Sequence, residues 1–211
     1  MESKKVALFT TKGLIGQSIA DEVLKRGYKL TVIVHDTSEF PVGRSGLKII
    51  RGDVNRYEDV SKCAMNHDVV IYDQVLRRNR EGECYNATRS IIMGCKAAHI
   101  KSLIISGRIN PVYPEILNDE LDSWRPVQEE QLAALELLER ELDISWSFFY
   151  TSETEITKKS NRFFASGNGF SVLTPAKQEA LTMKEYVKAL VNEIDKGEET
   201  QMEQKMTALT F

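Results

Sequence analysis

Short apolar runs and helical repeats alternate along the first half of this chain. The runs are almost entirely apolar or β-branched, as in strands that are covered on both faces. Between the runs, apolar residues recur at helical spacing, and Gly27 is expected to end the first helix. The pattern predicts strands at 6–9, 30–34, 47–50 and 69–72, and helices at 14–26 and 57–64.

The second half of the chain keeps the alternation and then becomes less regular. The pattern predicts helices at 86–98 and 128–141, and strands at 103–105 and 144–150. Gly167, Asn168 and Gly169 favour a hairpin turn between strands at 162–164 and 170–173. A capping box at 182–185 opens a last helix that runs to about 195, and 205–211 would suit a closing strand.

Parallel strands joined by helices require right-handed crossovers, so the order of elements predicts the fold class. We expect an α/β fold with a doubly wound parallel sheet of the Rossmann type, with a switch point beside the first strand. Ligands of such sheets bind at the carboxyl ends of the strands. We expect one domain over 1–211, in which about 108–127 and 151–181 form a small C-terminal lobe on the substrate side.

Composition narrows the function classes. The 211 residues are 42% hydrophobic and 28% charged, with a net charge of -3, which argues against nucleic-acid binding through bulk phosphate attraction. No run is long enough to cross a bilayer, and 1–5 leads directly into a strand, so we expect a cytoplasmic protein without a signal peptide. The three cysteines lack metal-like spacing, so we expect reduced thiols and no metal site. A homodimer remains open.

The turn after the first strand is the most informative motif. It reads Thr10-Thr11-Lys12-Gly13-Leu14-Ile15-Gly16 and leads into a helix, whose first amides can bind a diphosphate. Gly13 would permit close approach of a phosphate, and Gly16 would let the helix pack tightly on the sheet. Thr10 stands in place of a first glycine and is expected to resist a positive φ, while Lys12 could offer a cation. The alternative is a structural turn that binds nothing.

Two further strand ends carry candidate nucleotide contacts. Asp36 would suit the ribose hydroxyls of NAD, whereas a protonated His35 would suit the 2′-phosphate of NADP, and both could equally be solvated loop residues. Asp53 could accept a hydrogen bond from adenine or cap the short helix that follows. The sequence does not choose between NAD and NADP.

With these motifs in order, the chain resembles the atypical short-chain dehydrogenases, in particular their NmrA-like, NADH-flavin-reductase-like branch. The similarity rests on Gly13–Gly16, Arg26-Gly27-Tyr28, Gly52-Asp53-Val54 and 67–70, and it continues through 131–148 and 181–187. It implies a Rossmann fold, an NAD(P)H cofactor and hydride transfer to a flavin, quinone or similar planar acceptor. Some relatives only sense dinucleotides and regulate partners.

The resemblance also implies a set of site residues. Ser106, at the end of the strand at 103–105, would approach the nicotinamide and is the candidate catalytic residue, although it could equally be a buried hydroxyl bonded to backbone. The cofactor-binding residues that it implies are Gly13, Leu14, Ile15, Gly16, His35, Asp53, Val54, Tyr72, Asp73 and Gly107. The turn and strand-end positions themselves add Thr11, Lys12, Asp36 and Tyr150.

Several positions depart from that family. Thr10 interrupts the glycine turn, and Tyr72 and Asp73 could crowd the dinucleotide. No Tyr-x-x-x-Lys pair follows the strand at 103–105, which argues against a sugar-nucleotide epimerase and leaves the protein mainly to position two planar rings. The leading hypothesis is an NAD(P)H-dependent reductase, with FMN as one possible substrate whose phosphate the arginines at 77–80 could hold. The alternative is a pseudo-enzyme that acts as a dinucleotide sensor or binds a partner.

Overall fold

The computed structural model describes residues 3–10, 13–41, 43–74, 82–107, 125–152, 162–167 and 182–196. Seven strands form one sheet in the order β3-β2-β1-β4-β5-β6-β7. The first six are parallel, and β7 pairs antiparallel with β6. The strands are β1 Lys5–Phe9, β2 Lys29–Val34, β3 Leu47–Arg51, β4 Val69–Asp73, β5 Ser102–Gly107, β6 Ser145–Ser152 and β7 Arg162–Gly167.

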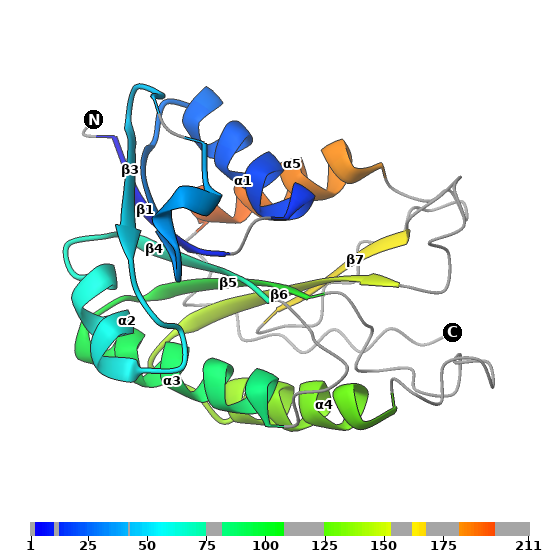
Figure 1. The fold of residues 1–211 in the computed structure, drawn as a ribbon. Coiled ribbons are helices and arrows are strands. Elements are labelled where there is room, and N and C mark those ends of the chain that lie inside the picture. Colours follow the sequence, from blue (N-terminus) through cyan, green and yellow to red (C-terminus); the bar gives the residue numbers. More distant parts are fainter. Residues whose placement is uncertain are drawn as a thin grey trace.

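Helices cover both faces of the sheet, which confirms the predicted doubly wound α/β architecture. Helices α1 and α5 lie on one face, and α2, α3 and α4 lie on the other (Figure 1). The chain leaves β1 toward β2 and β3 and then returns to β4 on the other side of β1, so the switch point lies between β1 and β4. The helices are α1 Leu14–Lys25, α2 Tyr57–Ala64, α3 Glu83–Ala97, α4 Arg125–Glu139 and α5 Met183–Lys196, with a 3₁₀ turn η1 at Thr37–Glu39.

Two apolar clusters, one on each face of the sheet, form the core. Alternate residues of each strand enter opposite clusters, as the pleat requires. In β4, for example, Ile71 packs toward α1 and α5, while Tyr72 packs toward α2, α3 and α4. The same alternation places the neighbouring side chains of Tyr72 and Asp73 on opposite faces of the sheet.

Helix ends follow the sequence signals closely. Gly27 has a φ of +80° and follows the end of α1, where its N–H and that of Tyr28 bond to carbonyls of the last turn. At α5, Thr182 Oγ1 accepts from the Glu185 N–H, and the Glu185 carboxylate accepts from the Thr182 N–H, which confirms the capping box.

The predicted starts of two helices were wrong by three residues each. Helix α3 begins at Glu83, and α4 begins at Arg125, because proline at position 126 is tolerated in a first helical turn. Leu132 and Leu142 share the helical spacing of the buried Leu135 and Leu138, which predicts a core position for all four, but Leu132 and Leu142 are exposed, and Leu142 lies beyond the end of α4.

The expected lobe and closing strand lie almost wholly outside the described residues. The described strand β7, from the range expected for the lobe, pairs with β6 at the edge of the main sheet. The expected hairpin partner at 170–173 and the strand at 205–211 are not among the described residues.

Candidate functional site

The first turn of α1 lies at the switch point, where Gly13 is the N-cap residue. Gly13 has φ −131° and ψ 157°, an extended conformation, and neither a capping side chain nor an acidic residue stands in the first turn. The first hydrogen bond of the helix joins the Gln17 N–H to the Gly13 carbonyl. The N–H groups before Gln17 have no acceptor within the helix itself, and Leu14 beside them is 74% exposed.

Gly16 lies against a buried pair of polar side chains. The Thr10 hydroxyl donates to Asp73 Oδ2 over 2.8 Å, and both residues are almost fully buried. A Cβ atom at Gly16 would lie 2.0 Å from Thr10 Oγ1 and 2.9 Å from Asp73 Oδ2, so only glycine fits. The expectation that Gly16 allows close packing of the helix is confirmed.

The backbone at Thr10 differs from the sequence-based expectation. Thr10 is not among the described residues with positive φ, and its N–H donates to the Ile33 carbonyl over 3.1 Å, so it extends the β1–β2 ladder. The β-branched side chain therefore meets no backbone strain here, and the expected conflict was wrong. Thr11 and Lys12, which were expected to contact the pyrophosphate, lie outside the described residues.

The loop after β2 holds His35 and Asp36 at the surface. Asp36 caps η1, where its Oδ1 accepts from both the N–H and the hydroxyl of Ser38. These hydrogen bonds are the main reason why the pKa of Asp36 is lowered, and the positive charge of Arg51 lowers it further. One carboxylate oxygen of Asp36 is thus already engaged within its own loop.

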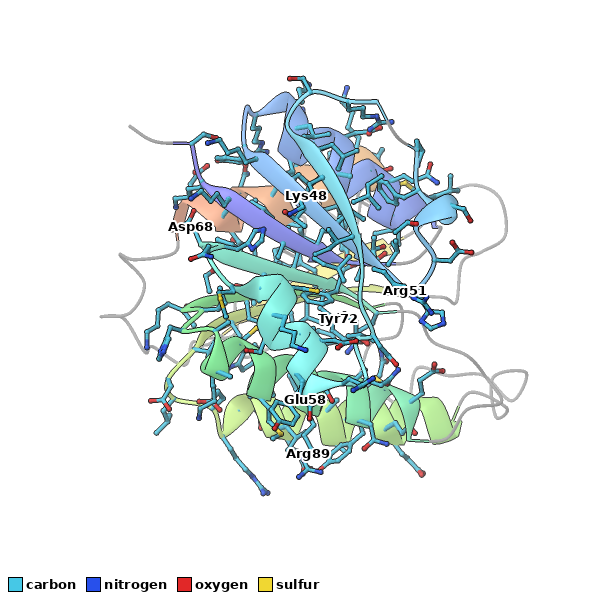
Figure 2. All side chains as sticks on the ribbon, turned by 60° about the vertical axis from the view of Figure 1, so that its left-hand side comes forward. Lys48, Arg51, Glu58, Asp68, Tyr72 and Arg89 are labelled. Carbon is cyan, nitrogen blue, oxygen red and sulfur yellow. The ribbon has the colours of Figure 1, made fainter. Side chains whose placement is uncertain are left out.

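Arg51 is a neighbour that sequence reasoning missed. It ends the edge strand β3, in register with Val34, and it is exposed at the carboxyl end of the sheet (Figure 2). Asp68, which precedes β4, marks the opposite end in the same view. The sequence could have pointed to Arg51 as a basic residue directly before Gly52-Asp53. A charged residue on an edge strand, however, usually serves only to prevent pairing with another sheet.

Asp53 organises the turn between β3 and α2. Its Oδ1 accepts from the N–H of Asn55 over 2.9 Å and from the Asn55 side-chain amide, while its own N–H donates to Asp59. Val54 packs against the core from a half-buried position. The carboxylate thus supports the turn that leads into α2, and a contact with adenine stays a prediction.

Tyr72 and Asp73, expected together beside the inner ribose, point to opposite faces of the sheet. The Tyr72 side chain lies in the core between the sheet and α3 (Figure 2), where burial raises its pKa. Asp73 points toward α1, where it meets Thr10. Of the two, only Asp73 lies near the helix N-terminus.

Ser106 lies on the same face as Asp73, in register with it on the neighbouring strand. Its hydroxyl is buried and lies 2.8 Å from the hydroxyl of Tyr186 on α5. Burial raises the pKa of Tyr186, so this phenol stays protonated. Tyr186 also makes an edge-to-face contact with Phe149, with ring centroids 6.0 Å apart. The hydroxyl thus pairs with a side chain, whereas one of the two alternatives left open by the sequence was a bond to backbone.

Gly107 lies at the end of β5 beside a second buried polar group on the opposite face. A Cβ atom there would lie 3.2 Å from Gln74 Oε1 and 3.3 Å from Gln131 Nε2. Tyr150 is in register with Gly107 on β6, but its side chain is not described. The strand ends therefore bring Thr10, Asp73 and Ser106 to one face, and the glutamines to the other.

Metal and membrane sites find no support in the described ranges. No three His, Cys, Asp or Glu side chains gather there in a way that could hold a metal ion. No helix within those ranges has the length and apolar character to span a membrane. All three cysteines are buried and free, and burial raises the pKa of Cys84 and Cys95 to about 12.

Comparisons with known proteins address the same region. A sequence model of an NAD(P)H-binding family matches residues 11–166. Among solved structures, a candidate NADH-flavin reductase from Streptococcus pneumoniae is 18% identical, with a TM-score of 0.66 over 92% of this chain and 94% of that chain. A candidate epimerase from Bacteroides thetaiotaomicron is 19% identical, with a TM-score of 0.65 over 92% of each chain.

A third similar structure is more distant. An anaerobillin reductase from Escherichia coli O157:H7 is 15% identical, with a TM-score of 0.56 over 68% of this chain and 70% of that chain. At such identities these likenesses establish the fold.

Proposed function

Because the chain belongs to the NAD(P)H-binding family, we propose that it is an oxidoreductase of the NmrA-like type that reduces a small planar acceptor, a flavin or a quinone. The observation that carries the proposal is the first turn of α1, which begins at Gly13 at the switch point with no acid and no capping side chain. Two of the similar structures are described as reductases or candidate reductases, which supports this reading.

In the proposed complex, a dinucleotide would lie across the carboxyl ends of the strands. The N–H groups of Leu14, Ile15 and Gly16 would hold the pyrophosphate, and the lack of a Cβ at Gly16 lets α1 approach β1 and β4 closely. Asp53 and Val54 would face adenine. When bound, the reduced nicotinamide supplies a hydride, and the protein aligns the two rings.

Ser106 is the residue that we assign to orient the reacting groups. Either hydroxyl of the Ser106–Tyr186 pair can be the donor, and in our assignment the Tyr186 O–H donates to Ser106 Oγ. The Ser106 proton is then left to donate to a carbonyl of the acceptor or to the carboxamide of the cofactor. In this assignment Tyr186 acts as a positioning residue and transfers no proton.

The test is a fluorescence titration of the full chain with NADPH and NADH, followed by absorbance at 340 nm with FMN and with menadione as acceptors. We expect binding in the micromolar range and oxidation that depends on the acceptor. Absence of binding at millimolar dinucleotide would contradict the proposal.

A pseudo-enzyme is the second candidate, and the Thr10–Asp73 pair favours it. This pair places a buried carboxylate against Gly16, beside the amides that would hold two phosphates. A sensor of dinucleotides or a partner-binding module could keep the fold with weakened affinity. Turnover of NADPH with either acceptor would refute this second candidate.

For the cofactor we propose NADP(H) rather than NAD(H). Asp36 Oδ1 is engaged by Ser38, which disfavours binding of two ribose hydroxyls by this carboxylate, whereas Arg51 offers positive charge at the end of the neighbouring strand. A 2′-phosphate pairs well with a guanidinium.

Replacing Arg51 with alanine tests this choice. We expect the R51A change to weaken NADPH binding by about tenfold while leaving NADH binding within about twofold, since only NADPH carries the extra phosphate. Fluorescence titrations of both dinucleotides measure the ratio. Lys48→Ala, which removes another exposed cation of the same strand, is the matched control. Equal effects of R51A on both dinucleotides would contradict the assignment.

A further inference from the structure

A pocket of about 360 Å³ opens at the amino ends of the central strands, where β1, β4 and β5 begin beside the last turn of α5. We name it the amino-end pocket. Asp68, which lines it, lies at the end of the sheet opposite to Arg51 (Figure 2). The length of β4 separates Asp68 from the switch point, a distance of about 16 Å, so the proposed function does not use this pocket. Its lining includes Lys4, Lys5, Asp68, His99, Lys101 and Ser102.

The amino-end pocket carries a net positive charge. Among the described residues that line it, three are lysines and one, Asp68, is an acid. Lys5, Asp68 and Lys101 each directly precede positions that pair across β1, β4 and β5, so they form one row over three neighbouring strands. The row therefore places one cation on each side of a carboxylate.

Two of the three ammonium groups are left for a ligand. Lys4 Nζ donates to the Ile194 carbonyl in the last turn of α5 over 2.7 Å. Within the part of the chain that the structure describes, neither Lys5 Nζ nor Lys101 Nζ has a hydrogen bond or an ion pair. Asp68 Oδ2 accepts from the backbone N–H of Lys5 over 2.7 Å, and Asp68 Oδ1 has no partner among the same residues.

A hydroxyl with little exposure belongs to the same pocket. Ser102 begins β5 and is 8% exposed, and its Oγ has no hydrogen-bond partner among the residues that the structure describes. A hydroxyl in such a place donates to whatever oxygen occupies the pocket, whether of water or of a ligand. The preceding Lys101 is exposed, so the pocket offers a donor at depth and a cation at its rim.

His99 adds a further donor from an unusual backbone. It follows α3 with a φ of +59°, and its N–H and that of Ile100 bond to the carbonyls of Lys96 and Cys95, as in a Schellman motif. Glycine is the usual residue at this position, because other residues lose free energy in the left-handed region. Ending α3 does not require an imidazole, whereas an imidazole that lines a cationic pocket can donate to an anion.

We infer that the amino-end pocket binds a small phosphate ester whose body carries hydroxyl groups, as in a polyol phosphate. Lys5, Lys101 and His99 would hold the phosphate, whose charge of about −2 matches the two ammonium groups of the row. Asp68 would accept from a hydroxyl of the body, because a carboxylate repels a bare oxyanion but binds an O–H donor. The volume of about 360 Å³ lies at the small end of ligand sites.

The test compares two phosphate esters that differ in their hydroxyl groups. Glycerol 3-phosphate carries hydroxyls on its body, and propyl phosphate has the same carbon skeleton without them. Isothermal titration calorimetry of the full chain gives both dissociation constants. We expect about 0.1 mM for glycerol 3-phosphate and binding about fivefold weaker for propyl phosphate. Malate, which spreads its charge over separate carboxylates, should bind at least about tenfold more weakly than glycerol 3-phosphate.

Variants of the two lysines assign the phosphate to the row. Lys5→Met and Lys101→Met keep the length of the side chain and remove its charge, and together they should weaken glycerol 3-phosphate binding at least about twentyfold. Lys29→Met is the matched control, because Lys29 is exposed, is in register with Lys5 on β2 and does not line the pocket. It should stay within about twofold of wild type.

Two further variants give results that unfolding cannot imitate. In Asp68→Ala, propyl phosphate should bind about threefold more tightly, because a negative charge has left the pocket, and the preference for glycerol 3-phosphate should disappear. In His99→Asn, the melting temperature should hold or rise, because asparagine tolerates the left-handed backbone, while the affinity for glycerol 3-phosphate falls about threefold.

The wild-type comparisons decide the matter even where a variant is unstable. No heat of binding at about 10 mM glycerol 3-phosphate, equal binding of the two esters, or malate binding as tight as that of glycerol 3-phosphate would each overturn the inference. Binding that survives the double lysine variant, or that falls as much in Lys29→Met, would place the ester elsewhere and would overturn it too. None of these results bears on NADPH, which is proposed to bind at the other end of the sheet.

Discussion

Gly13→Asp is expected to weaken NADPH binding about a hundredfold while the melting temperature stays level or rises slightly. Gly13 is an N-cap residue in an extended conformation that any L-residue can adopt. An aspartate there accepts from the first-turn N–H groups, which stabilises α1 by a few tenths of a kcal/mol relative to glycine. The same carboxylate would occupy the donors that the pyrophosphate needs and would repel its charge.

The neutral analogue separates charge from shape in this experiment. Gly13→Asn places a side chain of nearly the same size at the N-cap and caps the helix equally well, but it carries no charge. We expect it to weaken NADPH binding by about tenfold, less than aspartate does. Fluorescence titration gives the affinities, and thermal unfolding gives the stability. Unchanged affinity in Gly13→Asp would show that the dinucleotide does not bind at α1.

In the two Gly13 variants, stability is expected to rise while NADPH affinity falls, and this opposite change makes the experiment informative. Most substitutions that impair a site also destabilise the fold, so a loss of binding alone is ambiguous. Here the residue that best caps the helix is also the one that most disfavours the ligand. Helix termini that bind anions leave their own caps unused, as the first turn of α1 does.

The fold could be predicted from sequence because its signals are local. The apolar runs that became β1, β2 and β4, and the glycine that ends α1, are each visible within a window of a few residues. The position of the switch point then followed from the handedness of the crossovers. Boundaries were less certain where a helix begins before its apolar repeat, as α4 does at Arg125.

The contacts of the site could not be predicted because they join distant residues. Thr10 and Asp73 are 63 positions apart, Ser106 and Tyr186 are 80 apart, and Gln74 and Gln131 are 57 apart. No periodicity indicates that Asp73 turns toward α1 and the preceding Tyr72 turns toward α3. The pleat separates them by rule, but which face each takes depends on the register of β4 beside β1.

The outcome at Thr10 has a related cause. A threonine in a glycine turn suggests backbone strain, but no strain arises because the turn starts after Thr10, which still belongs to the ladder between β1 and β2. What the substitution changes is the chemistry beside Gly16. A hydroxyl and a carboxylate now lie where a glycine would leave space.

Replacing the Asp73 carboxylate in Asp73→Asn is expected to have the second large effect, a gain in NADPH affinity. An asparagine keeps the size of the side chain and can still accept from Thr10 Oγ1, but it removes a buried negative charge from beside the phosphate-binding amides. We expect NADPH to bind at least about tenfold more tightly, because repulsion between the carboxylate and the diphosphate is only weakly screened in a buried site. Titration of the variant and of wild type at the same ionic strength measures the change.

Thr10→Gly and Thr10→Ser show whether the pair acts as one unit. Thr10→Ser keeps the hydroxyl and should leave the NADPH affinity near the wild-type value, whereas Thr10→Gly removes the group that lies closest to Gly16 and should add to the gain in Asp73→Asn. If wild type binds NADPH only weakly and the double variant binds it well, the pair is what makes the chain a pseudo-enzyme.

The opposite result would assign Asp73 a productive role. A loss of NADPH affinity in Asp73→Asn would mean that the carboxylate accepts from the hydroxyls of the inner ribose, as the resemblance to short-chain dehydrogenases implies, because an amide is a weaker acceptor than a carboxylate. No change would mean that the ligand stays clear of Asp73 and that the Thr10–Asp73 bond only fastens β1 to β4. The direction in which NADPH affinity changes in Asp73→Asn therefore distinguishes three roles of the Asp73 carboxylate: repulsion of the ligand, contact with the ligand, and a purely structural bond.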